Sequence, residues 1–600
     1  MRRKKKPVML IVFAAVIVLS LLIYFFRYEL YFAFTSKGIN EKGGDITIVN
    51  AIIWTGDSTD LWKTSMTIKD GKITAMNADK PEGKVIDAQG KLIVPGFWDA
   101  HCHPHSPFIL TSPEAPTLFG AKTVKEVLDR LDKYVKEHPE DKFPRLFGWM
   151  SDIFKEGEKP TRQMIDAVVS DRPVCLVHHG GHSHWVNTKA LEMTGALEKD
   201  PPDMKGDGVI HRDPNTGLAT GYLQETEYAA TSGLMINLVK KIKPFSFEEQ
   251  VIIQQLILEE YPKVGVTSIW TKCGDLENTK IYEQILKNNS LPVRVCSDNM
   301  FTYYADISDI QKIHEYEKKS EESDLPKNFL RGGLLKVYID LPVVGWKWMF
   351  EPYDDDSTNR GKPAWETEYF KQQLYEADKL GMQINVSVYG DRGVHEILNL
   401  FEEMIKNNPP RDRRHMLEHA EFIKDSDLPR FRQLGVIASF NPIISYPDEG
   451  FQKNLVKSFG IKRLSETFNR YDKLIASGAV VLSGSDFPLA PVDPLIGIHI
   501  LVNGTDINGK EGLFQHTPIT IEQALYTYTV NPAYANFAEN RLGKLKTGYD
   551  ADFVILSENI LSPDFNKERL VKVKVNLTVF NGHIIYEDFS SKEKVIDFTK

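Results

Sequence analysis

The sequence has few cysteines, and this scarcity excludes one class of protein. Its 600 residues include only Cys102, Cys175, Cys273 and Cys296, too few for a fold built on disulfides. The net charge of −9, from 73 basic and 82 acidic residues, gives no support to nucleic-acid binding. With 42% hydrophobic and 26% charged residues, the composition is globular rather than disordered. The length allows several domains, or one large barrel with appended domains.

Several common functional signatures are also missing. The sequence lacks an internal repeat with a period of about 20–50 residues, which argues against a solenoid. The glycine-rich segment 504–512 lacks the P-loop pattern, so nucleotide binding is unsupported. No serine stands in a nucleophile-elbow context with a following acid and histidine.

The N-terminus combines a basic cluster with a long apolar run. Arg2, Arg3 and three lysines precede residues 8–26, which carry no charge. A helix of that length spans roughly 28 Å, about one hydrocarbon core. A cleaved signal peptide is the alternative, but its apolar region is shorter and ends in small residues, whereas bulky aromatic residues follow here. We therefore expect residues 1–34 to form a cytoplasmic tip and a single-pass transmembrane signal-anchor helix, with the large C-terminal part of the chain on the extracytoplasmic side.

Both ends of the remaining chain are rich in predicted β-strands. After a flexible linker at 35–44, residues 45–91 alternate apolar and polar positions around an Asp70-Gly71 hairpin. Within residues 543–600, the segments 550–557 and 573–587 alternate apolar and polar residues around an Asn581-Gly582 hairpin. We expect the two ends to assemble into one small composite β-sandwich domain.

The middle of the chain, residues 92–542, alternates short apolar strands with amphipathic helices, for example at 247–261, 365–380 and 425–433. Eight strands are predicted, at 92–99, 265–271, 292–298, 334–340, 383–388, 414–419, 435–441 and 479–485. This α/β pattern predicts a (β/α)8 TIM barrel with a large insertion after strand 1, at about 104–245. The insertion has its own helix (124–138) and a buried strand (174–178). A doubly wound sheet is the competing architecture.

Polar residues stand at the ends of these strands, where a barrel concentrates its catalytic groups. Imidazole, amine and carboxylate groups from four separate strands would meet at one mouth and could bind a divalent metal. These candidate residues are His101, His103, Lys336, His419 and Asp486.

Each candidate also has a structural interpretation. The H-x-H pair could be hydrogen-bonded strand-end histidines, and Lys336 could be a buried lysine paired with Asp340. His419 could be structural, and Asp486 could be a capping aspartate. Cys102, between the two histidines, points the other way and is expected to be a buried core thiol.

With these strand-end residues, the sequence resembles the amidohydrolase superfamily, in particular amidohydrolase family 3, the YtcJ-like metal-dependent hydrolases. The resemblance runs from about residue 45 to 587. The segments that carry it are VPGFWDAHCHPH (94–105), GGHSHWVNTKAL (180–191), GLATGYLQE (217–225), GVTSIW (265–270), LKVYID (335–340), YGDRGV (389–394), LEHAEFI (417–423), GSDFPLAPVDPL (484–495), TVNPAYA (529–535) and LGKLKTGYDADFVIL (542–556).

The resemblance implies a role for each candidate. His101 and His103 match the ligands of the more buried metal, and His419 matches a further histidine ligand. Lys336 matches a position that is a carbamylated, metal-bridging lysine in some members. Asp486 matches the aspartate that binds metal and takes a proton from the attacking water. Three residues of the insertion match a motif near the substrate: His182, Trp185 and Asn187.

One position departs from the family pattern. The family usually has a histidine on the fifth strand, whereas this sequence reads VSVYGDR with Ser387 at that place. A serine hydroxyl is a poor zinc ligand, so the more exposed metal position should be weakened. Neither Tyr389 nor His395 is an evident substitute. One firmly bound metal, zinc by expectation, is predicted, and the second is left open.

These observations predict a hydrolase that uses metal-activated water to cleave a non-peptide C–N bond (amide, N-acyl or formamide) of a small molecule. One alternative is a membrane-anchored binding or regulatory protein with an impaired barrel. Another is a metal-dependent deaminase or esterase. The expected partners are the small-molecule substrate and the membrane, with no nucleic acid, and homo-oligomerisation is left open.

Overall fold

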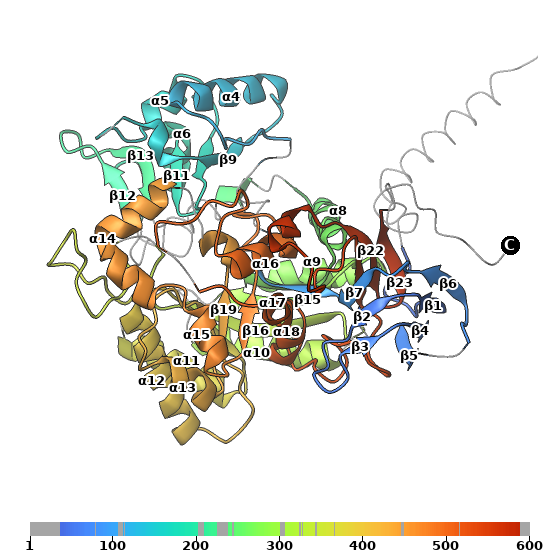
Figure 1. Cartoon of the computed structure of the whole chain (residues 1–600). Helices are drawn as coiled ribbons and strands as arrows, with labels where there is room; N and C mark the ends of the chain where they lie inside the picture. The colour runs from blue at the N-terminus through green and yellow to red at the C-terminus, as the bar shows by residue number, and fades with distance from the viewer. Residues whose placement is uncertain are drawn as a thin grey trace, which may run out of the picture.

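The computed structural model consists of an eight-stranded barrel, a β domain and a separate lobe (Figure 1). It describes residues 37–588 apart from 78–79, 106–111, 113, 156, 202–208, 225–237, 240, 243–244, 301–306, 323–325, 327, 343–344, 365–366, 446–448 and 515–516. The predicted anchor at residues 1–34 lies outside this part. Within it, no helix combines the length and apolar character needed to cross a bilayer.

Eight parallel strands form the central sheet, in one continuous order from β8 to β20. This order confirms the predicted α/β barrel over the doubly wound alternative, because the strands follow one another in sequence order and the order never reverses along the sheet. The strands are β8 (Phe97–Cys102), β14 (Val266–Gly274), β15 (Arg294–Met300), β16 (Leu330–Tyr338), β17 (Ile384–Val388), β18 (Met416–His419), β19 (Ile437–Phe440) and β20 (Val481–Ser483).

The barrel closes where the segment after β20 meets β8. The Asp486 amide donates to the His101 carbonyl at 2.7 Å, and the His103 amide donates to the Phe487 carbonyl at 2.7 Å. Gly484 makes this approach possible, because a Cβ there would lie 2.4 Å from the His101 nitrogen. Closure therefore brings the two ends of the sheet, and the polar residues they carry, into contact.

The first predicted strand, 92–99, is divided in the structure. Residues Leu92–Pro95 form β7 of the β domain, and the barrel strand β8 begins at Phe97. Gly96 separates the two strands, and a Cβ there would collide with Thr267. The correction places His101 inside a barrel strand rather than after one.

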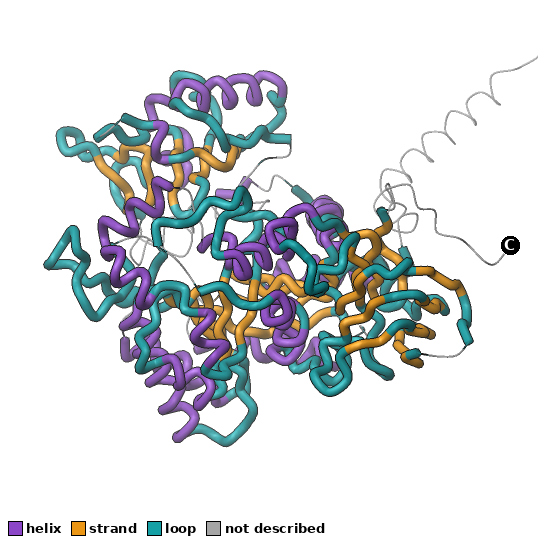
Figure 2. The backbone as a smooth tube through the Cα atoms, in the orientation of Figure 1, coloured by secondary structure: helices purple, strands orange, loops and turns teal. Residues whose placement is uncertain are grey.

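Helices surround the barrel strands (Figure 2). The helices predicted at 247–261, 365–380 and 425–433 are found as α8, α11 and α13, with bounds that differ by a few residues. A short 3-10 turn follows α8. Ser246 and Glu249 form a capping box that starts α8, and Gly435, with φ 65°, ends α13. The helices of the barrel region are α8 (Phe247–Leu258), α9 (Leu276–Lys287), α10 (Ile307–Glu322), α11 (Thr367–Lys379), α12 (Asp391–Asn407), α13 (Leu428–Leu434), α14 (Glu449–Thr467), α15 (Tyr471–Ala476), α16 (Pro494–Asn503), α17 (Ile521–Tyr528) and α18 (Val530–Ala535).

Both ends of the described chain contribute to a pair of sheets. One sheet has the order β5-β4-β1-β6 and the other β23-β22-β21-β7-β2-β3. The predicted hairpins at Asp70-Gly71 and Asn581-Gly582 are confirmed by the pairing of β4 with β5 and of β22 with β23. The bounds are β1 (Ile46–Val49), β2 (Ile52–Trp54), β3 (Trp62–Lys63), β4 (Met66–Lys69), β5 (Lys72–Met76), β6 (Lys84–Asp87), β21 (Phe553–Leu556), β22 (Val575–Phe580) and β23 (His583–Glu587).

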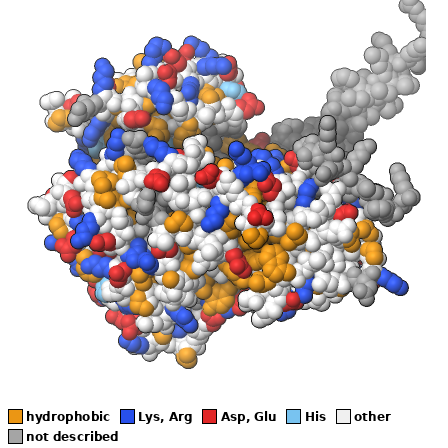
Figure 3. All heavy atoms as spheres, viewed as in Figure 1, with side chains coloured by type: hydrophobic (Ala, Val, Ile, Leu, Met, Phe, Trp, Pro, Cys, Tyr) orange, Lys and Arg blue, Asp and Glu red, His pale blue; other side chains and the backbone are white. Residues whose placement is uncertain are grey.

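The insertion after β8 forms a lobe with its own sheet, in the order β12-β13-β11-β10-β9. Two apolar clusters pack on this sheet, one around Trp149 and one around Leu191. The space-filling view shows a furrow between this lobe and the barrel (Figure 3). Its elements are α4 (Val124–Glu137), β9 (Arg145–Trp149), α5 (Arg162–Asp166), β10 (Cys175–His178), β11 (Ser183–Val186), α6 (Thr188–Thr194), β12 (Val209–Arg212) and β13 (Ala219–Gln224).

Candidate metal centre

Three predicted ligands lie together at the carboxyl end of the barrel. One ligand atom from each of His101, His103 and Asp486 lies within 4.8 Å of the other two, and all three residues are buried. His101 and His103 come from the end of β8, and Asp486 follows β20, so barrel closure assembles the cluster. Asp486 adopts a left-handed backbone conformation, with φ 62°.

The hydrogen bonds of the two imidazoles determine which nitrogen each presents to the centre. His103 Nδ1 donates to the Lys272 carbonyl at 2.9 Å, and His101 Nδ1 donates to the Glu418 carboxylate at 2.7 Å. When both rings are neutral, both Nε2 atoms therefore carry lone pairs. They lie 2.9 Å (His103) and 3.5 Å (His101) from the same Asp486 oxygen.

Three electron-pair donors at such distances repel one another unless a cation lies among them. A divalent metal or a proton would relieve the repulsion. The Nδ1 hydrogen bonds of His101 and His103 are also typical of metal-bound histidines, whose second ring nitrogen commonly donates to a carboxylate or a backbone carbonyl. In the protein without metal, burial lowers the pKa of His103, but bonds to Asp486 and Cys273 outweigh it and raise that pKa well above its usual range. The geometry and the donor set fit a divalent metal ion.

His419 lies beside this cluster at the end of β18. Its ring centroid is 4.8 Å from that of His101, and its other face stacks on Tyr389 at 4.7 Å. Its backbone has φ 65°, a conformation that non-glycine residues rarely adopt. Burial, followed by the neighbouring His101, lowers the pKa of His419 well below its usual range. The residue is therefore a neutral imidazole within reach of the cluster.

Lys336, on β16, is 1% exposed. Its nearest described carboxylate oxygen belongs to Glu418, at 3.9 Å, and its Nζ has no hydrogen-bond partner among the described residues. The alternative pairing with Asp340 is not formed, because that carboxylate accepts three backbone amides, from Trp348, Tyr389 and Gly390. Burial lowers the pKa of Lys336.

A buried ion-pair network supports the cluster from inside the barrel. Lys272 Nζ lies 2.8 Å from Glu418 and 3.3 Å from Asp298, and all three side chains are inaccessible. Burial opposes the charge of Glu418, but Lys272, Lys336 and His101 hold its pKa well below the usual range. Sequence reasoning did not assign Lys272, Asp298 or Glu418. The sequence does contain one signal for Lys272, because this charged residue directly follows a predicted apolar strand, in the segment TKCG.

Ser387, the next-to-last residue of β17, is buried and lines a small cavity next to the cluster. The cavity is also lined by Cys273, Lys336, Tyr338 and Tyr389, among others. The side chains around the missing fifth-strand imidazole therefore include a thiol, an amine and two phenols.

The three predicted substrate residues of the insertion lie in different surroundings. His182 is close enough to Asp486 and His103 to feel their charges, and burial lowers its pKa to about 4. Trp185 lies in the apolar core of the insertion and donates to the Thr161 carbonyl at 2.8 Å. Asn187 is fully buried and caps α6 by accepting from the Ala190 amide at 3.0 Å. The structure thus gives Trp185 and Asn187 roles in the fold of the insertion.

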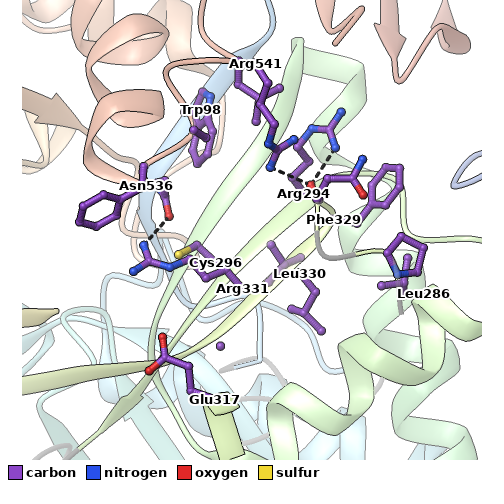
Figure 4. Close-up of a pocket in the computed structure, with 17 residues that line it drawn as sticks. Trp98, Leu286, Arg294, Cys296, Glu317, Phe329, Leu330, Arg331, Asn536 and Arg541 are labelled. Carbon is purple, nitrogen blue, oxygen red and sulfur yellow. Dashed lines mark hydrogen bonds between the residues drawn. The ribbon is translucent and has the colours of Figure 1, made fainter. Parts of the chain in front are cut away.

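A larger cavity, of about 350 Å³, lies at the amino-terminal end of the barrel strands (Figure 4). Arg294 and Arg331, at the starts of β15 and β16, line it, together with Asn536. Arg294 is paired with Asp552 at 2.7 Å, and Arg331 donates to Asn536 at 3.4 Å. Because catalytic groups of such barrels gather at the opposite end, this cavity is separate from the metal centre.

Comparison with known proteins agrees with the fold and the cluster. The chain is similar to Protein LONG AFTER FAR-RED 3 of Arabidopsis thaliana, with 27% identity over 93% of this chain and 94% of the relative. It is also similar to the putative amidohydrolase YtcJ of Bacillus subtilis, with 26% identity over 84% and 91%. The N-substituted formamide deformylase of Arthrobacter pascens is 22% identical over 90% and 98%. A metal-dependent hydrolase from Pyrococcus horikoshii has the same fold, with a TM-score of 0.67, 23% identity and coverage of 87% and 99%.

The barrel, the His-His-Asp cluster and these relatives define the class of protein as a metal-dependent hydrolase. The model of the amidohydrolase family matches residues 84–586. The chain belongs to the amidohydrolase family.

Proposed function

We propose that this protein hydrolyses a non-peptide C–N bond of a small molecule, in an amide, N-acyl or formamide group. The observation that carries the proposal is the convergence of both Nε2 atoms and one Asp486 oxygen in a buried cluster at the barrel mouth. The similarity to an N-substituted formamide deformylase supports formamides as the first substrates to test.

His101, His103 and Asp486 would hold one divalent ion, for which zinc suits the imidazole and carboxylate ligands. His419 and Lys336 are the candidates for a second. Such an ion, when bound, lowers the pKa of water towards neutrality and polarises a carbonyl.

The side chains of this protein would orient the reactants and move the proton. Asp486 accepts a proton from the attacking water and delivers it to the leaving nitrogen. Burial keeps His182 neutral, so its ring can donate a hydrogen bond to the substrate oxygen without adding charge. Glu418 keeps the proton of His101 on Nδ1, so that Nε2 stays directed at the centre.

The test replaces Asp486 with asparagine in the full chain. In Asp486→Asn, with the metal content measured in the same sample, we expect formate and amine release from N-substituted formamides to fall about 10²–10⁴-fold, the range of a general base. Asp171→Asn, an exposed carboxylate on the insertion, is the matched control and should retain full activity. A metal-loaded Asp486→Asn protein with wild-type turnover would refute the mechanism.

Two other activities are separated by the same assay. A deaminase would release ammonia from an aminopurine or aminopyrimidine, and an esterase would cleave carboxylic esters instead of formamides. Ser387 favours a third candidate, a binding or regulatory protein, because it removes an expected ligand. Such a protein would turn over none of these compounds even when it is loaded with metal.

We also propose that the N-terminal segment anchors the protein in a membrane with the hydrolase domain on the extracytoplasmic side. The support is the basic cluster followed by the uncharged run at residues 8–26. Removal of residues 1–34 should move the protein from the membrane fraction to the soluble fraction, while hydrolase activity is kept. Soluble full-length protein would contradict the proposal.

A further inference from the structure

The cavity at the amino-terminal end of the barrel strands has the features of a small-molecule binding site (Figure 4). Its volume of about 350 Å³ lies in the range of ligand pockets, and its wall combines apolar side chains with a few polar ones. Pro326 and Phe537, two of the lining residues, are exposed, so the cavity opens to solvent. The metal centre lies at the opposite end of the strands, and the proposed hydrolysis uses none of the side chains that line this cavity.

Two of the three arginines that line the cavity are neutralised by carboxylates of the fold. Arg294 lies 2.7 Å from Asp552 and 3.1 Å from Asp550. Its Nη1 donates to the Asn328 carbonyl at 2.8 Å. Arg541 shares two of these partners, at 2.7 Å from Asp550 and 3.1 Å from the Asn328 carbonyl. These contacts tie the barrel to the segment that leads into β21, so both side chains have structural roles.

The third arginine, Arg331 near the start of β16, has no such partner. Its Nη1 donates to the side-chain oxygens of Gln383, at 3.0 Å, and Asn536, at 3.4 Å. Both partners are neutral amides, and Arg331 forms no ion pair with a carboxylate of the described residues. Its Nε and Nη2 likewise have no hydrogen-bond partner in this part of the chain. Because a guanidinium stays charged in proteins, the cavity contains one cation that no ion pair of the described residues neutralises.

The two amides hold this guanidinium in place. Gln383 is buried and is itself fixed, since it donates to the Arg414 and Ala535 carbonyls at 2.6 and 3.1 Å. Asn536 is also buried and directly follows α18. With the Nη1 side of the guanidinium held by these partners, little conformational entropy is lost when the opposite edge, formed by Nε and Nη2, binds an anion.

An exposed aromatic ring lies beside the unpaired cation. The side chain of Phe537 is 41% exposed, and its ring centroid lies 5.2 Å from the guanidinium carbon of Arg331. The backbone of Phe537 has φ 56°, a strained conformation for a bulky residue that is found most often at functional sites. Leu286, Phe329 and Leu330 add further apolar surface to the lining. The cavity therefore offers an apolar wall next to a cationic edge.

We propose that this cavity binds a small monocarboxylate with an apolar body, such as an aromatic acid, and that Arg331 binds its carboxylate. The two oxygens of a planar carboxylate match the parallel donors of a guanidinium edge. The apolar body would pack against Phe537 and the leucines. Glu317 of α10 also lines the cavity, and its carboxylate disfavours a second negative charge on the ligand. A monoanion therefore fits better than a dianion such as phosphate.

The test titrates the full chain with benzoate in a calorimeter and, as a neutral molecule of the same shape, with benzamide. The protein is first stripped of metal, so that a carboxylate cannot coordinate an ion at the opposite end of the barrel. We expect benzoate to bind more tightly than benzamide. Arg331→Gln should weaken benzoate binding about 10–100-fold, the effect of losing hydrogen bonds to a charged group, and should leave benzamide binding unchanged.

Two further variants separate charge from apolar contact. Arg569→Gln is the matched control, because Arg569 is an exposed arginine outside the cavity, paired with Glu558 at 2.8 Å. It should leave both affinities unchanged. Phe537→Ala keeps the guanidinium and removes an exposed ring, so it should weaken benzoate and benzamide binding alike.

The comparison of benzoate with benzamide in the wild-type protein needs no variant. Equal affinities for the two compounds, or benzoate binding unchanged in Arg331→Gln, would overturn the role of Arg331. Inorganic phosphate that binds more tightly than benzoate would overturn the assignment of a monocarboxylate. If neither benzoate, phenylacetate nor hexanoate binds at millimolar concentration, the site itself is refuted. None of these outcomes affects the proposed hydrolase activity, which depends on the other end of the barrel.

Discussion

Glu418 supplies a negative charge to the two buried lysines beside the metal centre, Lys272 and Lys336. Its carboxylate lies 2.7 Å from His101 Nδ1, 2.8 Å from Lys272 Nζ and 3.9 Å from Lys336 Nζ. The substitution Glu418→Gln keeps the shape of the side chain and removes its charge. Two lysines, each no more than 1% exposed, then lose this counter-charge, and among the described carboxylates only Asp298, 3.3 Å from Lys272, still lies within 4 Å of either.

Removal of one partner from a buried ion pair typically lowers the free energy of unfolding by about 3–5 kcal/mol. Glu418 also holds the ring of His101, and loss of such a supporting contact lowers metal affinity about 10–100-fold. We therefore expect Glu418→Gln to lower both the stability of the barrel and its affinity for zinc. Chemical unfolding of the metal-free protein and titration against a zinc chelator measure the two effects separately.

A matched control is available on the surface. Glu137 is exposed and lies 3.9 Å from Lys133 in the same helix, so Glu137→Gln should change stability by less than about 0.5 kcal/mol. In addition, Lys272→Met should recover part of the stability lost in Glu418→Gln, because it removes one uncompensated charge. A Glu418→Gln protein with stability and zinc affinity equal to those of the Glu137→Gln control would refute the role assigned to the network.

Three further predictions concern the stability of the fold. Gly484→Ala should destabilise the protein by about 1–3 kcal/mol and weaken zinc binding, because its Cβ would lie 2.4 Å from the His101 nitrogen. The control is Gly44→Ala, whose Cβ would have nothing within 4 Å. This control should leave thermal unfolding unchanged. Asn187→Ala should lower stability by about 2–4 kcal/mol through the lost helix cap and buried bonds without changing turnover per folded molecule. Burial raises the pKa of Asp378, but hydrogen bonds from the buried His415 and Arg413 side chains outweigh it and lower that pKa below its usual value. The folded state therefore binds fewer protons, and the contribution of Asp378 to stability is present above about pH 4 and lost below it. Asp378→Asn should be less stable than wild type at neutral pH and show a shallower acid decline, and equal pH profiles would contradict this.

The sequence predicted the barrel well because its strands are short apolar runs bounded by glycine, proline and polar residues. The H-x-H motif at the end of one strand and the Ser-Asp pair after another were recognisable for the same reason, since each stands at a strand end. The division between β7 and β8 was missed, because the apolar pattern continues across Pro95 and Gly96.

The interior network could not be predicted in this way. Lys272, Asp298 and Glu418 come from three strands, and only barrel closure shows that they meet. Trp185 and Asn187 match a family motif, but a motif match does not distinguish a substrate contact from a cap or a core residue.

The most direct test of the account measures metal and turnover in one preparation. The protein is stripped with a chelator, reloaded with zinc, and assayed for formate release from N-substituted formamides alongside His101→Ala. The account predicts no activity without metal, recovery on reloading in the wild type, and neither tight zinc binding nor recovery in the variant. Formamide hydrolysis that survives complete removal of metal, or a zinc-loaded wild-type protein that cleaves no C–N bond, would contradict it.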